Sequence, residues 1–214
     1  MSSQGFTLFD TAVGRCGIAW GACGILGVQL PERHEDRTRA RLMGRYPDAA
    51  EIPAPPDVQG AIDDIVALLR GEKRDLSAIP LDMERVPTFQ RLVYAVARTI
   101  PAGATLSYGD IAARLGDPAA TRDVGEAMGQ NPFPLIVPCH RVLASGGKVG
   151  GFSAAGGVTT KLRLLGIEGA QIGERPTLFE DLPLSIRPKG GQVRRQRLGE
   201  RFGKVVRGML LPLC

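Results

Sequence analysis

The segment Asn131-Pro-Phe-Pro-Leu-Ile-Val-Pro-Cys139-His140-Arg141-Val142 carries the most informative pattern of this sequence. Its apolar, proline-rich first part shields Cys139, and the neighbouring His140 and Arg141 supply cationic character that favours a thiolate. A buried structural cysteine is the alternative, and it is the commoner fate of this residue type. Side chains that are adjacent in sequence point apart, so a bridging water would have to link Cys139 to His140. The segment indicates a reactive thiol with a histidine base.

Three helices are predicted before this segment. Thr88 precedes apolar residues at helical spacing, and Ser107 with Asp110 forms a variant of the capping box that begins a second helix. The third helix runs from Thr121 to Gly129, and Pro132 prevents its continuation. This half of the chain is therefore expected to be mostly helical.

The second and third helices, joined by a turn over residues 117–120, predict a helix-turn-helix with Arg122 at the start of the reading helix. Gly125 is small enough to let a DNA backbone approach, whereas Asp123 and Glu126 place negative charge where phosphates would lie. Many helical hairpins have no nucleic-acid role, so this pattern by itself leaves DNA binding open.

The first part of the chain predicts a small antiparallel sheet with helices. Short strands are expected over Thr7–Leu30, and an exposed helix is expected over His34–Arg45. Asp57 is predicted to cap an amphipathic helix that ends at Gly71, and Leu76–Leu81 is predicted to be another strand. The fold class is therefore α+β, with a sheet-and-helix unit followed by a helical one.

Length and composition exclude several classes of protein. The 214 residues are 43% hydrophobic and 23% charged, as in ordinary globular proteins. Apolar stretches fall short of the roughly 20 residues that a membrane span needs, and no secretory signal is evident, so a cytoplasmic location is expected. Between Arg187 and Arg207, eight basic residues stand against one acid, which leaves the rest of the chain at −2 of the net +5. This basic stretch is either a solubilising end or a non-specific phosphate clamp.

Metals and nucleotide cofactors are not expected. Cys16, Cys23, Cys139 and Cys214 are widely separated in a chain that is large enough to need no disulfide framework, so reduced thiols are predicted. Cys16, Cys23 and His34 lack the compact spacing and the fourth ligand of a zinc site. The glycine-rich stretches lack a P-loop lysine pattern.

The cysteine motif and its surroundings resemble a known family. Pro138–Val142, preceded by Asn131-Pro132 and followed by Gly150-Gly-Phe152, Lys161…Leu164-Leu165 and Glu168-Gly169, resembles the O6-alkylguanine-DNA alkyltransferases, or methylated-DNA–protein-cysteine methyltransferases. The resemblance covers residues 87–169 and extends weakly to the less uniform N-terminal region. Together with the residue patterns, it predicts an N-terminal α+β domain over 1–85 and a catalytic DNA-binding domain over 86–173. The resemblance thins beyond Gly173, where the charge pattern predicts a basic extension over 174–214.

The resemblance implies direct reversal of DNA damage. Cys139 would take the alkyl group from O6-alkylguanine, with O4-alkylthymine as a second substrate, in one irreversible step, so that each molecule acts once. A thiolate suits this reaction because displacement at carbon from an aryl ether needs a strong nucleophile. The implied partner is double-stranded DNA containing the lesion, no membrane is involved, and we expect a monomer.

The resemblance also assigns roles to residues around the thiol. His140 would take the thiol proton through a water while Glu168 orients the imidazole. Asn131 would brace the active-site turn, and Tyr108 would help to rotate the nucleotide and donate a hydrogen bond to the departing guanine. Ordinary structural roles are the alternative for each residue.

A second set of residues is predicted to bind the lesion and the DNA. Arg122 would fill the gap that the flipped nucleotide leaves. The backbone carbonyls of Cys139 and Val142 would contact guanine's exocyclic amine, and Phe152 with Ser153 would form the mobile wall of the pocket. Gly125 and Arg141 complete this set.

Two other functions remain open at this point. A lesion-sensing relative would bind damaged DNA without repairing it, but such relatives lack the acceptor cysteine that this chain has. A cysteine hydrolase that uses Cys139 and His140 would need an oxyanion hole, which the sequence does not indicate.

Overall fold

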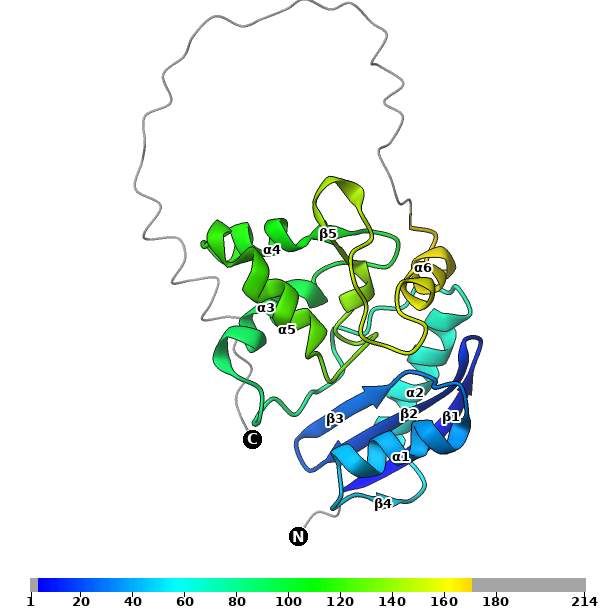
Figure 1. Ribbon diagram of the computed structural model, residues 1–214. Helices are drawn as coiled ribbons and strands as arrows, with labels where there is room; N and C mark the ends of the chain where they lie inside the picture. The colour runs from blue at the N-terminus through cyan, green and yellow to red at the C-terminus, as the bar shows by residue number, and fades with distance from the viewer. Residues whose placement is uncertain (1–3, 171–214) are drawn as a thin grey trace, which may run out of the picture. The chain divides into compact units, whose positions relative to one another are not determined.

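The computed structural model describes residues 4–170, all within one compact unit (Figure 1). Its small sheet and its helices confirm the α+β class. The predicted boundary at residue 85 stays a prediction, and the basic extension lies outside the described residues. Within residues 4–170, no helix is long and apolar enough to cross a membrane.

The N-terminal sheet has four strands in the order β3-β2-β1-β4. Strands β1 (Gly5–Thr11), β2 (Gly14–Gly21) and β3 (Gly24–Gln29) are antiparallel, and the short β4 (Ala50–Glu51) pairs in parallel with β1. The strands expected over Thr7–Leu30 are therefore confirmed. Strands β2 and β3 each begin, directly after a two-residue turn, with a glycine at positive φ, Gly14 and Gly24.

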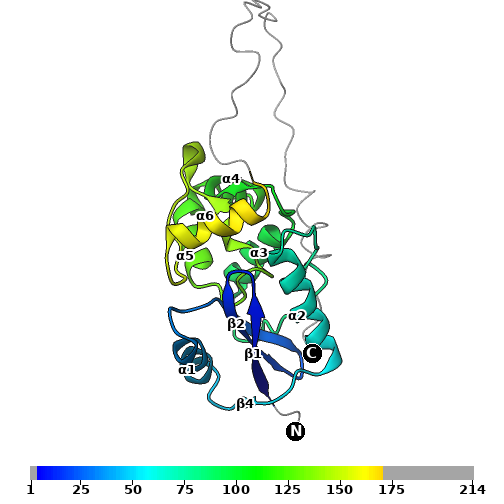
Figure 2. The same cartoon turned by 90° about the vertical axis from the view of Figure 1, so that its right-hand side faces the viewer.

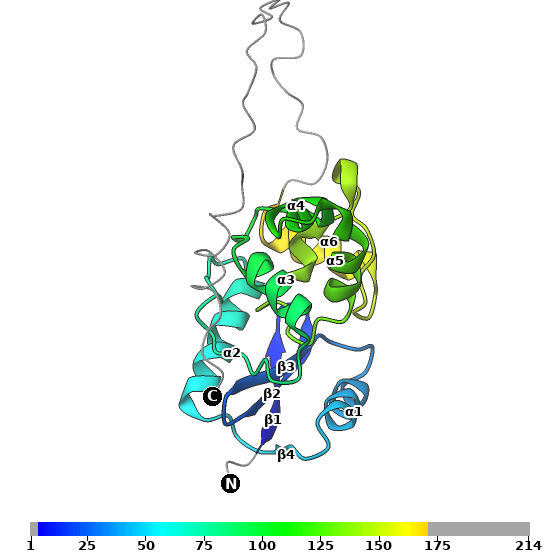
Figure 3. The same ribbon diagram turned by 90° about the vertical axis from the view of Figure 1, so that its left-hand side faces the viewer.

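Helices α1 (Glu35–Arg45) and α2 (Pro56–Leu69) lie on opposite sides of this sheet (Figures 2 and 3). The alternation of side chains along β2 explains this arrangement. Ile18 belongs to the large core that includes α2, whereas Ala19 packs with Leu42 of α1. At Gly17 the helix α1 approaches so closely that a Cβ would collide with Leu42.

Two local expectations in this region are wrong. Asp57 does not cap α2, because the helix begins one residue earlier at Pro56, whose missing N–H costs nothing in a first turn. Residues 77–79 form a turn instead of a strand, because the Asp75 side chain accepts a hydrogen bond from the Ser77 N–H at 2.8 Å. The end of this segment contacts the sheet at Ile25, whose N–H donates to the Pro80 carbonyl at 2.9 Å and which forms an isolated bridge with Leu81.

The second half of the described chain is mostly helical, as expected. Its elements are α3 (Thr88–Arg98), β5 (Leu106–Ser107), α4 (Tyr108–Arg114), η1 (Pro118–Ala120), α5 (Thr121–Gly129), η2 (Cys139–Arg141), β6 (Val142–Leu143), η3 (Ser145–Gly147) and α6 (Val158–Ile167). The predicted capping box begins α4: Asp110 N–H donates to Ser107 Oγ at 3.0 Å, and Ser107 N–H donates to the Asp110 carboxylate at 2.8 Å. Helices α4 and α5 with η1 between them form the predicted helix-turn-helix.

A short strand pair that the sequence did not predict joins the helix-turn-helix to the cysteine segment. Strands β5 and β6 pair in parallel, with Leu106 opposite Val142 and Ser107 opposite Leu143. Because α4 begins directly after β5, this pairing brings Tyr108 beside the residues that follow Cys139.

The sheet also supports the loop that leads to Cys139. Val28 N–H of β3 donates to the carbonyl of Pro132 at 2.9 Å, and the Tyr46 hydroxyl donates to the carbonyl of Leu26 at 2.6 Å. Between these two contacts lies Gly27, where a Cβ would meet the Tyr46 hydroxyl and would lie 2.9 Å from the Pro132 carbonyl oxygen. The N-terminal sheet is therefore in direct contact with the cysteine loop.

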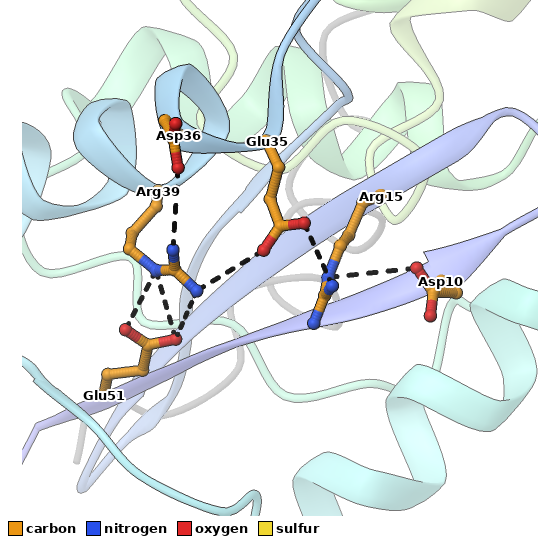
Figure 4. A network of polar contacts seen from close by, with 6 residues as sticks. All are labelled: Asp10, Arg15, Glu35, Asp36, Arg39 and Glu51. Atoms are coloured by element: carbon orange, nitrogen blue, oxygen red, sulfur yellow. Dashed lines mark hydrogen bonds and ion pairs between the residues drawn. The ribbon is translucent and has the colours of Figure 1, made fainter.

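A network of exposed ion pairs ties α1 to the sheet (Figure 4). Arg39 contacts Glu51 of β4 at 3.0 Å and Glu35 at 3.4 Å, and Glu35 contacts Arg15 of β2 at 3.0 Å. Each exposed pair contributes little stability, and the face of α1 that is turned to the sheet is the one that carries the buried Leu42.

We expect Gly27→Ala to destabilise the protein by about 1–3 kcal/mol, because the added methyl group would push β3 away from Tyr46 and Pro132. Urea unfolding measures the change. Gly44→Ala is the matched control: it lies in α1 with no heavy atom within 4 Å of its Cβ position, and we expect it to stabilise by about 0.5–1 kcal/mol. Equal effects of the two substitutions would contradict the close packing at Gly27.

Candidate active site

Cys139 is the first residue of η2 and is only 8% exposed. Burial raises the pKa of its thiol, while a hydrogen bond with the Asn131 side chain and the positive charge of Lys161 act in the opposite direction. The sequence analysis attributed the stabilisation of the thiolate to the positive charges of His140 and Arg141. In the structure, Lys161 supplies this positive charge, because the Arg141 guanidinium is turned toward a carboxylate. The thiol therefore needs a base to ionise at neutral pH.

Glu168 joins the residues that follow Cys139 into one buried polar cluster. Its Oε1 accepts hydrogen bonds from His140 Nε2 at 2.9 Å and from Arg141 Nη2 at 2.8 Å, and its Oε2 accepts from Arg141 Nε at 2.8 Å. Burial acts to raise the pKa of Glu168, but these donors outweigh it and hold the pKa at about 2. Glu168 is therefore a carboxylate at neutral pH.

His140 is neutral and has one nitrogen available as a base. The residue is 1% exposed, and burial lowers its pKa more than Glu168 raises it. Because Glu168 is ionised, we assign the ring proton to Nε2, which donates to the carboxylate. Nδ1 is buried and has no hydrogen-bond partner among residues 4–170. Its lone pair can accept a proton.

Arg141 is 6% exposed, and its predicted place in the lesion-binding set stays a prediction. Besides its two hydrogen bonds to Glu168, its Nη1 donates to the carbonyl of Ile100. A guanidinium that is engaged on both sides in this way holds Glu168 in place.

Asn131 braces the cysteine loop as expected. Its Nδ2 donates to the carbonyl of Val137 at 2.8 Å, and its Oδ1 accepts from the N–H of Phe133 at 2.9 Å. The loop between these contacts includes Leu135 at φ +75°, a backbone conformation that is unfavourable for leucine and is held here by burial. The approach to Cys139 is thus a preorganised turn.

Lys161 was quoted in the sequence analysis only as part of the resemblance and was given no role there. It is fully buried in α6, and its Nζ donates to the carbonyls of Val142 at 2.6 Å and Gly151 at 3.4 Å. It also lies 5.9 Å from the centre of the Tyr108 ring. Burial lowers its pKa to about 8. Its position on the buried stripe of α6, three residues before Leu164, was the available signal.

Tyr108 and Val142 both lie at this site. Tyr108 is half-buried, and burial followed by the nearness of Cys139 raises the pKa of its phenol. The Val142 carbonyl, predicted to contact guanine, accepts from Lys161, and the Cys139 carbonyl accepts from the Val142 N–H. Lys161 therefore fixes the direction of the Val142 carbonyl.

A cavity of about 60 Å³ opens beside Cys139. Its walls come from the cysteine loop, from the loop before α6, from the end of β3 and from α1. The lining residues are Val28, Gln29, Leu30, Arg41, Arg45, Asn131, Pro134, Cys139, Phe152, Ser153 and Ala154. Phe152 and Ser153 thus line a cavity beside the thiol, and their role as the mobile wall of the lesion pocket stays a prediction. The two arginines of α1 were not predicted.

Arg122 and Gly125 lie apart from this cluster, on α5. Arg122 is exposed at the second position of the helix and makes no hydrogen bond or ion pair with the residues that the structure describes. No heavy atom lies within 4 Å of a Cβ built at Gly125. Packing within residues 4–170 does not explain either residue type.

Of the remaining cysteines, Cys16 and Cys23 lie within the described residues and Cys214 lies outside them. Cys16 is a free, buried thiol whose pKa burial raises to about 12, and Cys139 is also free. Cys23 is disulfide-bonded, so the expectation of a reduced thiol is wrong for it. Among residues 4–170, no group of three or more histidine, cysteine, aspartate or glutamate side chains is placed to hold a metal ion.

Comparison with known proteins relates this site to a family. Residues 88–170 match the model of the 6-O-methylguanine DNA methyltransferase DNA-binding domain. A methylated-DNA–protein-cysteine methyltransferase of Mycobacterium tuberculosis is 41% identical over 128 residues, which are 60% of this chain and 75% of that protein. Its counterpart in Methanothermobacter thermautotrophicus is 35% identical over 156 residues, which are 73% of this chain and 80% of that protein.

Solved structures agree with the sequence relatives. The crystal structure of Mycobacterium tuberculosis OGT in complex with DNA matches with a TM-score of 0.61 and 34% identity, over 77% of this chain and 92% of that one. The O6-methylguanine-DNA methyltransferase of Pyrococcus kodakaraensis matches with a TM-score of 0.59 and 26% identity, over 77% of this chain and 99% of that one. The chain belongs to the methylated-DNA–protein-cysteine methyltransferase family.

Proposed function

We propose that Cys139 accepts the alkyl group of O6-alkylguanine in double-stranded DNA, in one irreversible displacement that restores guanine. The observation that carries this assignment is a buried thiol at the edge of a cavity, next to a histidine that a buried carboxylate orients. Direct reversal of DNA damage is the activity of the family to which the chain belongs. O4-alkylthymine is a second candidate substrate, and we infer that a monomer in the cytoplasm performs the reaction.

The proposed reaction begins with the transfer of the thiol proton. His140 Nδ1 accepts it through a bridging water, and Glu168 stabilises the imidazolium that forms. The thiolate then attacks the alkyl carbon: the S–C bond forms, the C–O6 bond breaks, and guanine leaves with the bonding electron pair. The Tyr108 hydroxyl donates a hydrogen bond to the departing guanine, which gains charge in this step.

Lys161 supports the same step from the opposite side. Its ammonium group acts to lower the pKa of Cys139, so it stabilises the thiolate that the relay produces. It also holds the Val142 carbonyl, whose second lone pair is available to the exocyclic amine of guanine. This lysine is a positioning residue for the base as well as an electrostatic one for the sulfur.

Delivery of the base requires the nucleotide to leave the duplex, which costs a few kcal/mol of unstacking. Helix α5 is the element of the helix-turn-helix that would enter the groove, and its exposed Arg122 is free to occupy the gap. The open side of Gly125 would allow the DNA backbone to approach this helix.

Mixing the protein with a duplex that contains one O6-methylguanine should add a single methyl group to Cys139, saturating at one per molecule. Intact mass followed by peptide mapping measures this, and Cys139→Ser, which keeps the shape but lacks the thiolate, should acquire none. Lesion binding without modification would favour a sensor instead. Repeated turnover of an ester by Cys139 would favour a hydrolase.

Glu168→Gln should slow alkyl transfer by about 100-fold, because His140 loses the carboxylate that stabilises its protonated form. In the wild type, the rate should fall on the acid side with a midpoint below the ordinary histidine pKa of about 6.5, because burial lowers the pKa of His140. Glu168 acts to raise this pKa, so the midpoint should move to still lower pH in the variant. Single-turnover rates across pH measure both effects.

An unchanged midpoint in Glu168→Gln would remove Glu168 from the relay even if the rate fell. Affinity for undamaged duplex DNA is the control, and it should change little, because Glu168 is buried away from the surface.

Arg122→Ala should slow repair of a duplex by about tenfold or more, since nothing would then offset the loss of stacking around the flipped nucleotide. The reaction with free O6-benzylguanine, which needs no flipping, should be affected much less. Arg70→Ala, which removes an exposed arginine at the end of α2, is the matched control. Equal losses on duplex and free base would argue against a role in flipping.

A further inference from the structure

The three-residue turn η2 separates two cavities. Cys139, its first residue, lines the cavity beside the thiol, and Arg141, its last residue, lines a second cavity of about 390 Å³. Because a 3-10 helix has three residues per turn, side chains two positions apart point in different directions. The first cavity includes residues of α1 and the second includes residues that follow α2, and these helices lie on opposite sides of the sheet (Figure 2). The second cavity is therefore a site apart from the thiol.

This second cavity is large enough for a small organic molecule. Its volume lies within the range of about 300–1,000 Å³ that is typical of ligand sites. The segment after α2, the end of α3 with the loop that follows it, and η2 form its walls. In that loop, Ile100, Pro101 and Ala102 add an apolar surface. The cavity thus offers room and an apolar wall for the organic part of a ligand.

Four cationic side chains and one carboxylate line the cavity. Arg141 is buried and Arg98 is partly buried, so these two guanidiniums form its deeper part. Lys73, Arg74 and Asp75 are exposed and lie at its rim. A ligand that enters would therefore meet positive charge both at the opening and at the base.

Two of the four cations are already paired with carboxylates. Arg74 Nη2 lies 2.8 Å from Glu72, and Arg141 Nη2 lies 2.8 Å from Glu168. Lys73 forms no ion pair with any residue that the structure describes. Its ammonium group is therefore available to a ligand at the rim.

Arg98 carries a charge that no contacting carboxylate balances. Its Nη2 donates to the carbonyls of Ser77 and, at 2.8 Å, of Ile79, and its Nε is buried without a hydrogen-bond partner among residues 4–170. The guanidinium forms no ion pair within that part of the chain. Burial lowers the pKa of Arg98, because desolvation disfavours its charged form. An anion that reaches this guanidinium would supply the missing counter-charge.

Asp75 moderates the positive charge from the rim. Its carboxylate accepts a hydrogen bond from the Ser77 N–H at 2.8 Å, and this contact lowers its pKa, with Arg98 and Arg141 acting in the same direction. The two guanidiniums are thus within electrostatic range of Asp75 but not in contact with it. Because this carboxylate is exposed and well solvated, it weakens the binding of an anion without occupying the site.

We propose that this cavity binds a small phosphate monoester, whose phosphate contacts Arg98 and Arg141 while Lys73 attracts it from the rim. A planar guanidinium matches the oxygens of a phosphate in bidentate geometry. Arg141 has five N–H donors and uses three of them on Glu168 and Ile100, so two remain for a ligand. The phosphate can belong to a free metabolite or to the 5′ end of a DNA strand, and both sources share this chemistry.

Calorimetric titration of the full chain at low ionic strength tests the proposal. Ribose 5-phosphate and ribose are compared, because they differ only in the phosphate group. We expect the first to bind with a Kd below about 1 mM and the second not to bind. A short undamaged duplex with 5′ phosphates, compared with the same duplex ending in hydroxyl groups, tests a DNA end as the source.

Lys73→Gln should weaken the binding of ribose 5-phosphate by about two- to fivefold, the range expected for one exposed charge. Asp75→Asn should strengthen it by a similar factor, because asparagine keeps the acceptor for the Ser77 N–H and removes the negative charge. Neither substitution breaks an ion pair. Arg98→Gln should weaken binding by about tenfold or more. Arg70→Gln is the matched control, since this exposed arginine at the end of α2 does not line the cavity, and it should leave the Kd unchanged.

The opposite effects of Lys73→Gln and Asp75→Asn decide the outcome even if Arg98→Gln folds poorly. Phosphate-dependent binding that both of these variants leave unchanged overturns the site, and so does the absence of phosphate-dependent binding in both arms. Binding of the phosphorylated duplex alone, changed in opposite directions by the two variants, supports the site and assigns the phosphate to a DNA end. Alkyl transfer to Cys139 does not enter this test, so its result leaves the proposed function unaffected.

Discussion

The buried carboxylate of Glu168 is the contact on which the catalytic half of this protein depends. It caps the end of α6, receives both His140 and Arg141 from η2, and is linked through Arg141 to the carbonyl of Ile100 after α3. Removing one partner of such a cluster leaves a buried charge uncompensated, at a cost of about 3–5 kcal/mol. The same carboxylate sets the tautomer of His140, so the stability of this region and the basicity of the relay come from one group.

The burial of Cys139 explains why a relay is needed at all. A low-pKa thiol on the surface would react and oxidise readily, and for a residue that can be used only once such side reactions would be a permanent loss. Desolvation keeps the Cys139 thiol protonated, and Lys161 and Asn131 offset this only in part. In the proposed mechanism, reactivity then depends on His140 as the base and on a substrate that fills the cavity. Protection and reactivity are combined by burying the nucleophile next to its base.

The N-terminal sheet contributes to the site as well as to the fold. Its strand β3 holds the cysteine loop through the Val28 contact with Pro132, and its helix α1 supplies two arginines that line the cavity beside Cys139. The ion pairs around Arg39 are individually weak, and the buried Leu42 fixes the face of α1 that meets the sheet.

Features that depend on contacts between neighbouring residues could be predicted from the sequence. The capping box of Ser107 and Asp110 and the helix Thr121–Gly129 follow from hydrogen bonds and periodicity within a few positions, and the motif around Cys139 identified the chemistry. The strand predicted over Leu76–Leu81 failed because a local Asp75 turn outweighed β propensity.

Contacts between distant segments could not be predicted from the sequence and are seen in the folded structure. Arg141 holds Glu168, 27 residues away, and the ammonium of Lys161 donates to the carbonyl of Val142. Arg45 comes to share a cavity with Cys139 from the other half of the chain. These arrangements arise from the packing of whole helices and strands, where burial and charge compensation select one arrangement that no local pattern encodes.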